Sequence, residues 1–287
     1  MNGLRAGAIV LTTGLMLILA GCGGGGGDGG DGASSTTPDL NGAWKATTNK
    51  STYGFMDYAV ISQSSSILTG TFYGGATLTG AVTGNSIYIL ATHPCTTMVL
   101  TGTYANNQFN LNSVTYNKVS ALPMNIALQT KTIAVDGITS DWAGISPITT
   151  DATGDGNALG GSDITAFYAA KDATNLYFRI DVANGPPVGG LYYGIIFDGS
   201  TFSASSTTRR FVLVNVTENS ASVVQWATAC GGTETNIKNG ILAFSGNTIE
   251  LSVPKDQLNL AASGHVYLWN DSGGNHIDNT SLVGVTF

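Results

Sequence analysis

A two-residue period in the second half of the chain is the strongest constraint on its fold. Residues 175–182 and 191–198 both follow this two-residue period. Successive side chains of a β-strand point to opposite faces, so each segment is predicted to be a strand with one face in a core. The residues that share the apolar face of the first segment are Leu176, Phe178, Ile180 and Val182.

Further short strands are predicted along the same half of the chain. Only 255–260, which follows Pro254, has the pattern of a helical turn. About eight strands without a strong helical segment indicate an all-β, two-sheet sandwich over 131–287. The additional predicted strands are 164–170, 211–216, 222–227, 248–253 and 265–271.

A second β-region is expected over 38–130, where the tripeptide Leu-Thr-Gly occurs at 68–70, 78–80 and 100–102. Short alternating runs around these turns predict an antiparallel meander, either a small barrel or a curved sheet. The segment Gly42-Ala43-Trp44 resembles the start of the first strand in lipocalin-like and avidin-like barrels. A ligand in the barrel mouth is one alternative, but a scaffold or spacer is favoured.

The amino terminus resembles the leader of bacterial lipoproteins. Arg5 precedes an apolar run over 6–20, which ends in Leu19-Ala20-Gly21-Cys22. The resemblance implies a signal peptide over 1–22, lipidation of Cys22 and a membrane anchor that does not span the bilayer. The alternative is an ordinary secretory signal with an incidental cysteine. Gly23, not Asp, follows Cys22, and the resemblance to Gram-negative lipoproteins then implies sorting to the outer membrane. The Gly/Ser-rich stretch 23–37 is expected to be a flexible tether.

The charge distribution excludes nucleic acid as a partner. Residues 131–287 hold 7 basic and 14 acidic side chains, which equals the whole net charge of −7. Phosphate binding requires clustered Lys and Arg, and this surface lacks them. Cations or neutral ligands suit it better.

One loop in the second region combines three carboxylates, Asp151, Asp155 and Asp163, with several glycines. Calcium in proteins takes six to eight oxygen ligands, so these side chains are candidates for a calcium site. The alternative is that the aspartates cap turns through local hydrogen bonds and bind no metal.

The order of motifs over 131–287 resembles family 9 carbohydrate-binding modules and the wider DOMON-like sandwich group. The resemblance implies a jelly-roll-like sandwich with structural calcium and, in some members, a sugar held between aromatic rings. Other members bind haem, but this region contains no Met and no Cys-x-x-Cys-His, so no haem is expected here. The motifs that carry the resemblance are Ile133–Gly137, Asp141-Trp142, Asp151-x3-Asp155, Asp163-Ile164, Asp172-x2-Asn175-Leu-Tyr-Phe178 and Ile249–Pro254.

Sugar binding requires exposed aromatic faces beside hydrogen-bonding side chains. Trp269 shares the more polar face of its strand with Tyr267, and Trp226 is a further candidate. Core packing of Trp226 remains the alternative. Trp142 is expected to close one end of the sandwich.

Two cysteines follow Cys22, namely Cys95 and Cys230. In an oxidising compartment they could form a disulfide between the two regions, or remain as separate thiols. No catalytic motif is present, so the chain is not expected to be an enzyme. We expect an envelope-anchored lipoprotein with a carbohydrate-binding module. The alternative is a structural or adhesion-type surface protein whose sandwich does not bind sugar, and the sequence carries no signal of oligomeric state.

Overall fold

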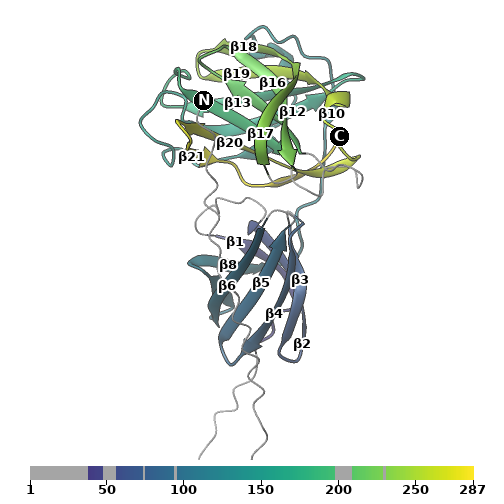
Figure 1. Ribbon diagram of the computed structural model, residues 1–287, viewed down its shortest axis with the longest axis vertical. Helices are drawn as coiled ribbons and strands as arrows, with labels where there is room; N and C mark the ends of the chain where they lie inside the picture. The colour runs from purple at the N-terminus through teal and green to yellow at the C-terminus, as the bar shows by residue number, and fades with distance from the viewer. Residues whose placement is uncertain (1–37, 48–55, 74, 94–95, 198–208, 229–230) are drawn as a thin grey trace, which may run out of the picture. The chain divides into compact units, whose positions relative to one another are not determined.

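The computed structural model describes residues 38–47, 56–73, 75–93, 96–197, 209–228 and 231–287. The described elements are β-strands and short 3-10 turns, which confirms the predicted all-β class (Figure 1). Within these ranges, no helix has the length and hydrophobicity needed to cross a bilayer.

The first region is a closed, eight-stranded antiparallel barrel in which each strand pairs with the next and β1 pairs with β8. The barrel alternative for the predicted meander is therefore confirmed. Figure 1 draws these strands in purple to blue. They are β1 (Gly42–Ala46), β2 (Tyr58–Ser64), β3 (Ile67–Phe72), β4 (Thr77–Thr83), β5 (Ser86–His93), β6 (Thr96–Ala105), β7 (Gln108–Leu111) and β8 (Val114–Val119).

The barrel interior is filled by its own side chains. Trp44 is fully buried, and its Nε1 donates a hydrogen bond of 2.8 Å to the carbonyl of Leu40. The rings of Phe109 and Tyr116 stack with their centroids 4.6 Å apart. An eight-stranded barrel is just wide enough for side chains to fill, and the described interior is packed in this way.

The Leu-Thr-Gly repeat explains how the barrel closes. In each copy the leucine is buried in the barrel core and the glycine lies two residues further along the strand. A β-carbon on Gly102 would lie 1.5 Å from the carbonyl oxygen of Asn110, and one on Gly80 would lie 2.1 Å from that of Tyr88. These glycines therefore permit an approach of neighbouring strands that other residues would block.

The second region is a sandwich of a six-stranded and an eight-stranded sheet. The first, called the β13 sheet, has the order β10-β12-β13-β19-β18, with β11 paired to β12. Its strands are β10 (Gln129–Thr130), β11 (Thr149–Thr150), β12 (Asp163–Lys171), β13 (Asn175–Ala183), β18 (Ile241–Ser245) and β19 (Thr248–Pro254).

The second sheet, called the β14 sheet, has the order β17-β16-β15-β14-β20-β22-β9, with β21 paired to β20. Its strands are β9 (Ile126–Ala127), β14 (Leu191–Phe197), β15 (Arg210–Asn215), β16 (Ser220–Thr228), β17 (Gly231–Asn239), β20 (Ser263–Ser272), β21 (Asn275–Asn279) and β22 (Val283–Thr286). Strands β9 and β10 show that the sandwich takes in residues 126–130, which the sequence analysis assigned to the first region.

The core of the sandwich lies between the inner faces of the two sheets. Every apolar residue that the alternation of 175–182 placed on one face is buried in this core, and so are Leu191, Tyr193, Ile195 and Phe197 of β14. The predicted strands are confirmed at 164–170, 211–216, 222–227, 248–253 and 265–271. The expected turn after Pro254 is the 3-10 helix η4 (Lys255–Gln257).

The prediction that Trp142 closes one end of the sandwich is wrong. Trp142 ends the 3-10 helix η2 (Thr139–Trp142) and packs with Ile133 and Tyr177 in a cluster apart from the main core. Its Nε1 donates a 2.9 Å hydrogen bond to Glu250 on β19. Glu250, which alternation places on the solvent side, is fully buried because this segment covers it.

Candidate functional site

Strand β20 places the predicted sugar-binding residues on the outer face of the β14 sheet. Val266 and Leu268 are buried in the main core, so Tyr267 and Trp269 point the other way. On that side both rings pack, partly buried, on a small apolar cluster. The same cluster includes Trp226 of β16, so the three predicted side chains share one surface. We call Trp226, Tyr267 and Trp269 the aromatic face.

Trp226 belongs to this face and not to the core. Its ring lies 4.8 Å from that of Phe211, which forms the floor of the cluster. The guanidinium of Arg209 lies 5.6 Å from the centroid of Trp226, a cation–π distance. The indole Nε1 donates to a carboxylate oxygen of Glu234 on β17 at 3.3 Å. Of the two alternatives for Trp226, the surface position is the observed one.

The indole ring of Trp269 lies over β14 at a position where that strand has no side chain. Gly194 on β14 is the cross-strand partner of Trp269. A β-carbon on Gly194 would lie 2.3 Å from Cε2 of the indole. The indole therefore rests against the β14 backbone.

Two carboxyl groups border the aromatic face. Asp271 follows Trp269 on the same face of β20 and is only 7% exposed. Desolvation, with a further contribution from the negative charge of Glu234, raises the pKa of Asp271 to about 6. Sequence reasoning missed Glu234, because β17 has a polar sequence without apolar alternation.

Glu234 and Asp271 stand on β17 and β20, which are separated by three strands of the β14 sheet. Glu234 accepts the hydrogen bond from Trp226 Nε1, and Asp271 follows Trp269 on the outer face of β20. Each tryptophan of the aromatic face therefore has a carboxyl group beside it.

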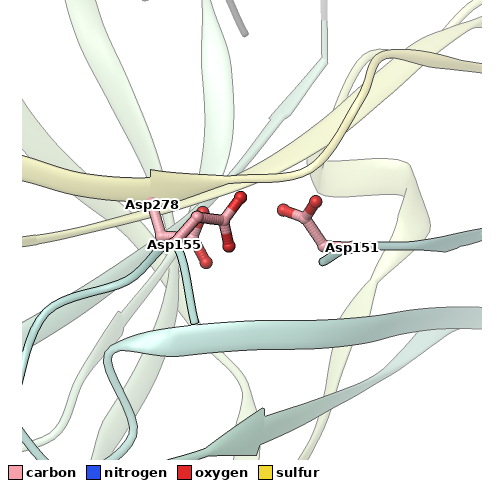
Figure 2. A group of neighbouring side chains, drawn as sticks. All are labelled: Asp151, Asp155 and Asp278. Atoms are coloured by element: carbon pink, nitrogen blue, oxygen red, sulfur yellow. The ribbon is translucent and has the colours of Figure 1, made fainter. Parts of the chain in front are cut away.

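A second acidic group lies at the start of β12. The carboxylates of Asp151, Asp155 and Asp278 each offer an oxygen, and these oxygens all lie within 4.8 Å of one another. In Figure 2 the carboxylate of Asp151 points toward those of Asp155 and Asp278. Two of the three predicted metal ligands are thus brought together, and the third member, Asp278 on β21, was missed. No sequence signal marks it, because only strand pairing brings β21 to this loop.

Asp163, the remaining predicted ligand, is fully buried beside the same group. Its Oδ2 accepts a 2.8 Å hydrogen bond from the backbone N–H of Gly154. Its Oδ1 is buried and has no hydrogen-bond partner among the described residues. The next residue, Ile164, donates its backbone N–H to Asp278 at 2.8 Å. A buried carboxylate oxygen without a donor is costly unless a proton or a cation satisfies it. The donor set, all oxygen, fits calcium.

Asn270 connects the two sites. This fully buried residue stands between Trp269 and Asp271 on β20, with its side chain on the inner side. Its Nδ2 donates to the carbonyl of Ser162 at 2.8 Å, and its Oδ1 accepts from the backbone N–H of Asp278 at 3.0 Å. The strand that carries the aromatic face is therefore tied to the loop that carries the acidic group.

Asp136, Asp141 and Asp172, which belong to the motifs of the family resemblance, accept hydrogen bonds within the fold. Asp141 accepts from the N–H of Ala134, and Asp136 accepts from that of Ile138. Asp172 caps the turn between β12 and β13, and a hydrogen bond from Tyr177 holds the pKa of its carboxyl well below the usual range.

The predicted lipidation site and the possible disulfide, Cys22, Cys95 and Cys230, lie outside the described residues. No protein-family model and no curated protein matches this chain.

Proposed function

We propose that this chain is a non-catalytic lipoprotein of the bacterial envelope whose sandwich binds carbohydrate on the aromatic face. The observation that carries the proposal is the gathering of Trp226, Tyr267 and Trp269, all partly exposed, on one outer face of the β14 sheet. Large aromatic side chains usually lie in cores, so three on one accessible surface indicate a binding site.

The chemistry of this face suits a sugar ring. A pyranose has apolar C–H faces that stack on indole and phenol rings, and hydroxyl groups at its edges. Beside the rings, Glu234 and Asp271 supply hydrogen-bond acceptors, and Arg209 supplies donors. The Trp269 ring rests on the Gly194 backbone and is already held in place. Ligand binding therefore costs little side-chain entropy at Trp269.

Calcium is proposed as a structural component of the same domain. Asp151, Asp155 and Asp278 would hold the ion, and the orphaned Oδ1 of Asp163 supports a cation in their neighbourhood. A bound calcium would neutralise the mutual repulsion of these carboxylates and would fasten the 151–163 loop to β21.

Glycan-array screening of the mature chain, followed by calorimetric titration of the best oligosaccharide, tests the sugar proposal. Trp269→Ala is expected to abolish binding, because it removes the ring that stacks on the sugar. Tyr88→Ala is the matched control, since Tyr88 is an aromatic residue of the barrel that is 48% exposed. Absence of any bound glycan, or full affinity in Trp269→Ala, would refute the proposal and favour the structural or adhesion-type alternative.

Anchoring at Cys22 is tested separately by metabolic labelling with a palmitate analogue and membrane fractionation. The proposal expects label on the wild type in the outer-membrane fraction. Cys22→Ser is expected to lose the label and to leave the membrane. Label retained on Cys22→Ser, or unlabelled wild type, would contradict it.

A further inference from the structure

The two tryptophans of the aromatic face occupy diagonal positions on the β14 sheet. Strands β15 and β14 lie between β16, which carries Trp226, and β20, which carries Trp269. The cross-strand row of Trp269 runs through Gly194 and Leu213 to Ser222 on β16. Trp226 follows Ser222 further along β16, on the same outer face. The two side chains are therefore offset both across the strands and along them.

Both indoles lean toward β15, the strand that separates them on the face. The ring of Trp269 lies over Gly194 of β14, and the ring of Trp226 lies 4.8 Å from that of Phe211 on β15. Leu213, the next outward residue of β15 after Phe211, packs on the same cluster. With strands about 4.8 Å apart and alternate residues about 6.6 Å apart, the two indoles lie on the order of 10–15 Å from each other.

The indole of Trp226 rests on groups at the level of the sheet. Phe211 beneath it is fully buried. The guanidinium of Arg209 lies 5.6 Å from the ring centroid and donates hydrogen bonds of 3.1 and 3.2 Å to the backbone carbonyl of Phe197. These bonds hold Arg209 down against the backbone. The partial exposure of Trp226 therefore comes from the side of the ring that points away from the sheet.

A single sugar ring is too small to contact both indoles. Single bonds of about 1.5 Å give a pyranose ring and its linking oxygen a length of about 5 Å along a chain. A separation of 10–15 Å therefore corresponds to about two or three steps of a sugar chain. Two rings that clasp one sugar must also face each other across it. Trp226 and Trp269 instead lie on one face of one sheet, joined by the apolar side chain of Leu213.

We propose that the aromatic face binds an internal stretch of a linear polysaccharide, with one sugar unit stacked on Trp269 and another on Trp226. This inference rests on the proposed carbohydrate binding and names its substrate class: linear chains of at least about three units, bound without recognition of a chain end. Tyr267 shares the outer face of β20 with Trp269 and adds to the contact at that end. Leu213 offers an apolar surface to the C–H groups of the unit between the two indoles.

Calorimetric titration of the mature chain with linear β-linked oligomers of two to six units tests this proposal. The probes are series of glucose, mannose, xylose and N-acetylglucosamine. In the series that binds best, the affinity is expected to rise at least about ten-fold from the disaccharide to the tetrasaccharide, because a second stacking contact is added. It should change little from there to the hexasaccharide. A hexasaccharide whose reducing end has been reduced with borohydride should bind equally well, because the chain end makes no contact.

Trp226→Ala removes the contact at the far end of the chain. It is expected to lower the affinity for the tetrasaccharide at least about ten-fold and to leave that for the disaccharide within about two-fold, since the disaccharide sits on Trp269 and Tyr267. Trp226→Phe keeps a ring that packs on Phe211 and should lose less. Tyr88→Ala again serves as the control, because this exposed tyrosine belongs to the barrel.

The outcomes separate the two proposals. Equal affinity from disaccharide to hexasaccharide, or loss of affinity on reduction of the chain end, overturns the linear-chain inference but leaves carbohydrate binding standing. Equal losses for the two lengths in both Trp226 variants overturn it as well, and so does binding to arrayed glycans but to none of the linear series. Failure of every linear oligomer and every arrayed glycan to bind defeats carbohydrate binding itself.

Discussion

The indole of Trp269 lies against the backbone of Gly194, so close that a β-carbon at position 194 would stand 2.3 Å from Cε2 of the ring. Contacts this short do not occur in folded proteins, so any larger residue at 194 must displace the indole. A residue with no side chain thus determines where one of the two indoles of the aromatic face lies.

Gly194→Ala is therefore expected to move Trp269, to lower stability by about 1–3 kcal/mol and to weaken sugar binding at least about ten-fold. Tryptophan fluorescence and calorimetric titration provide the measurements. Gly189→Ala is the matched control, because its nearest neighbour would be Thr217 Oγ1 at an ordinary 3.5 Å. A Gly194→Ala protein with wild-type spectrum and affinity would contradict the role assigned to this contact.

Asp271 is expected to make stability depend on pH in a defined direction. Its pKa in the folded protein is raised to about 6 from 3.8, so the neutral carboxyl favours folding below about pH 4, and that contribution is lost as the pH rises through 6. Asp271→Asn should be more stable than the wild type at pH 8, by on the order of 1–2 kcal/mol, and similar to it near pH 4. Urea denaturation at the two pH values measures the difference. A variant less stable than the wild type at pH 8 would show that the ionised carboxyl is satisfied within the protein.

Glu250 is expected to hold the segment 133–142 on the β13 sheet. Its carboxylate accepts from Trp142 Nε1 at 2.9 Å and from the backbone N–H of Gly137 at 2.8 Å. Glu250→Ala leaves both donors without an acceptor and should lower the free energy of unfolding by about 2–4 kcal/mol. Glu250→Gln keeps one acceptor and should lose less. Urea denaturation, with a double-mutant cycle to Trp142→Phe, provides the test, and a coupling energy near zero would contradict the pairing.

If the proposed calcium site is correct, calcium is expected to raise the melting temperature of the protein and a chelator to lower it, because the ion would bind only the folded arrangement of Asp151, Asp155 and Asp278. Asp278→Asn should remove most of this response. Asp163→Asn tests the neighbouring carboxylate, whose Oδ1 has no partner among the described residues. Differential scanning calorimetry with and without EDTA measures the shifts. Equal melting temperatures with and without EDTA would contradict calcium binding at this site.

Local patterns in the sequence predicted most of the longer strands that face the core, but not β18 or β22. In β13 and β14 the alternation identified the residues that face the main core, because inward and outward positions alternate along a strand. It did not identify Tyr177 and Ile196, which are buried on the outer faces of the two sheets. Strands β17 and β21 were not predicted, because their sequences are polar and their pairing depends on β16 and β20.

Missing those two strands also meant missing the residues they carry. Asp278 stands far along the chain from Asp151 and Asp155, and no spacing rule connects them. Glu234 lies beside Trp226 because of the register between β16 and β17, which its polar sequence does not reveal. Burial of Glu250 was missed for a related reason. Alternation assigns a residue to one side of a sheet, but it does not tell whether another segment covers that side.

By itself, the sequence determined the all-β class, the barrel-compatible meander, the sandwich and the face on which Trp269 lies, since these depend on short-range periodicity and turn residues. Only the tertiary structure decided that Trp226 joins Trp269 on one surface, that Glu234 lies beside Trp226, and that Asp278 completes the acidic group. The physical reason is that long-range strand pairing brings these side chains together, and this pairing arises from the packing of the whole domain.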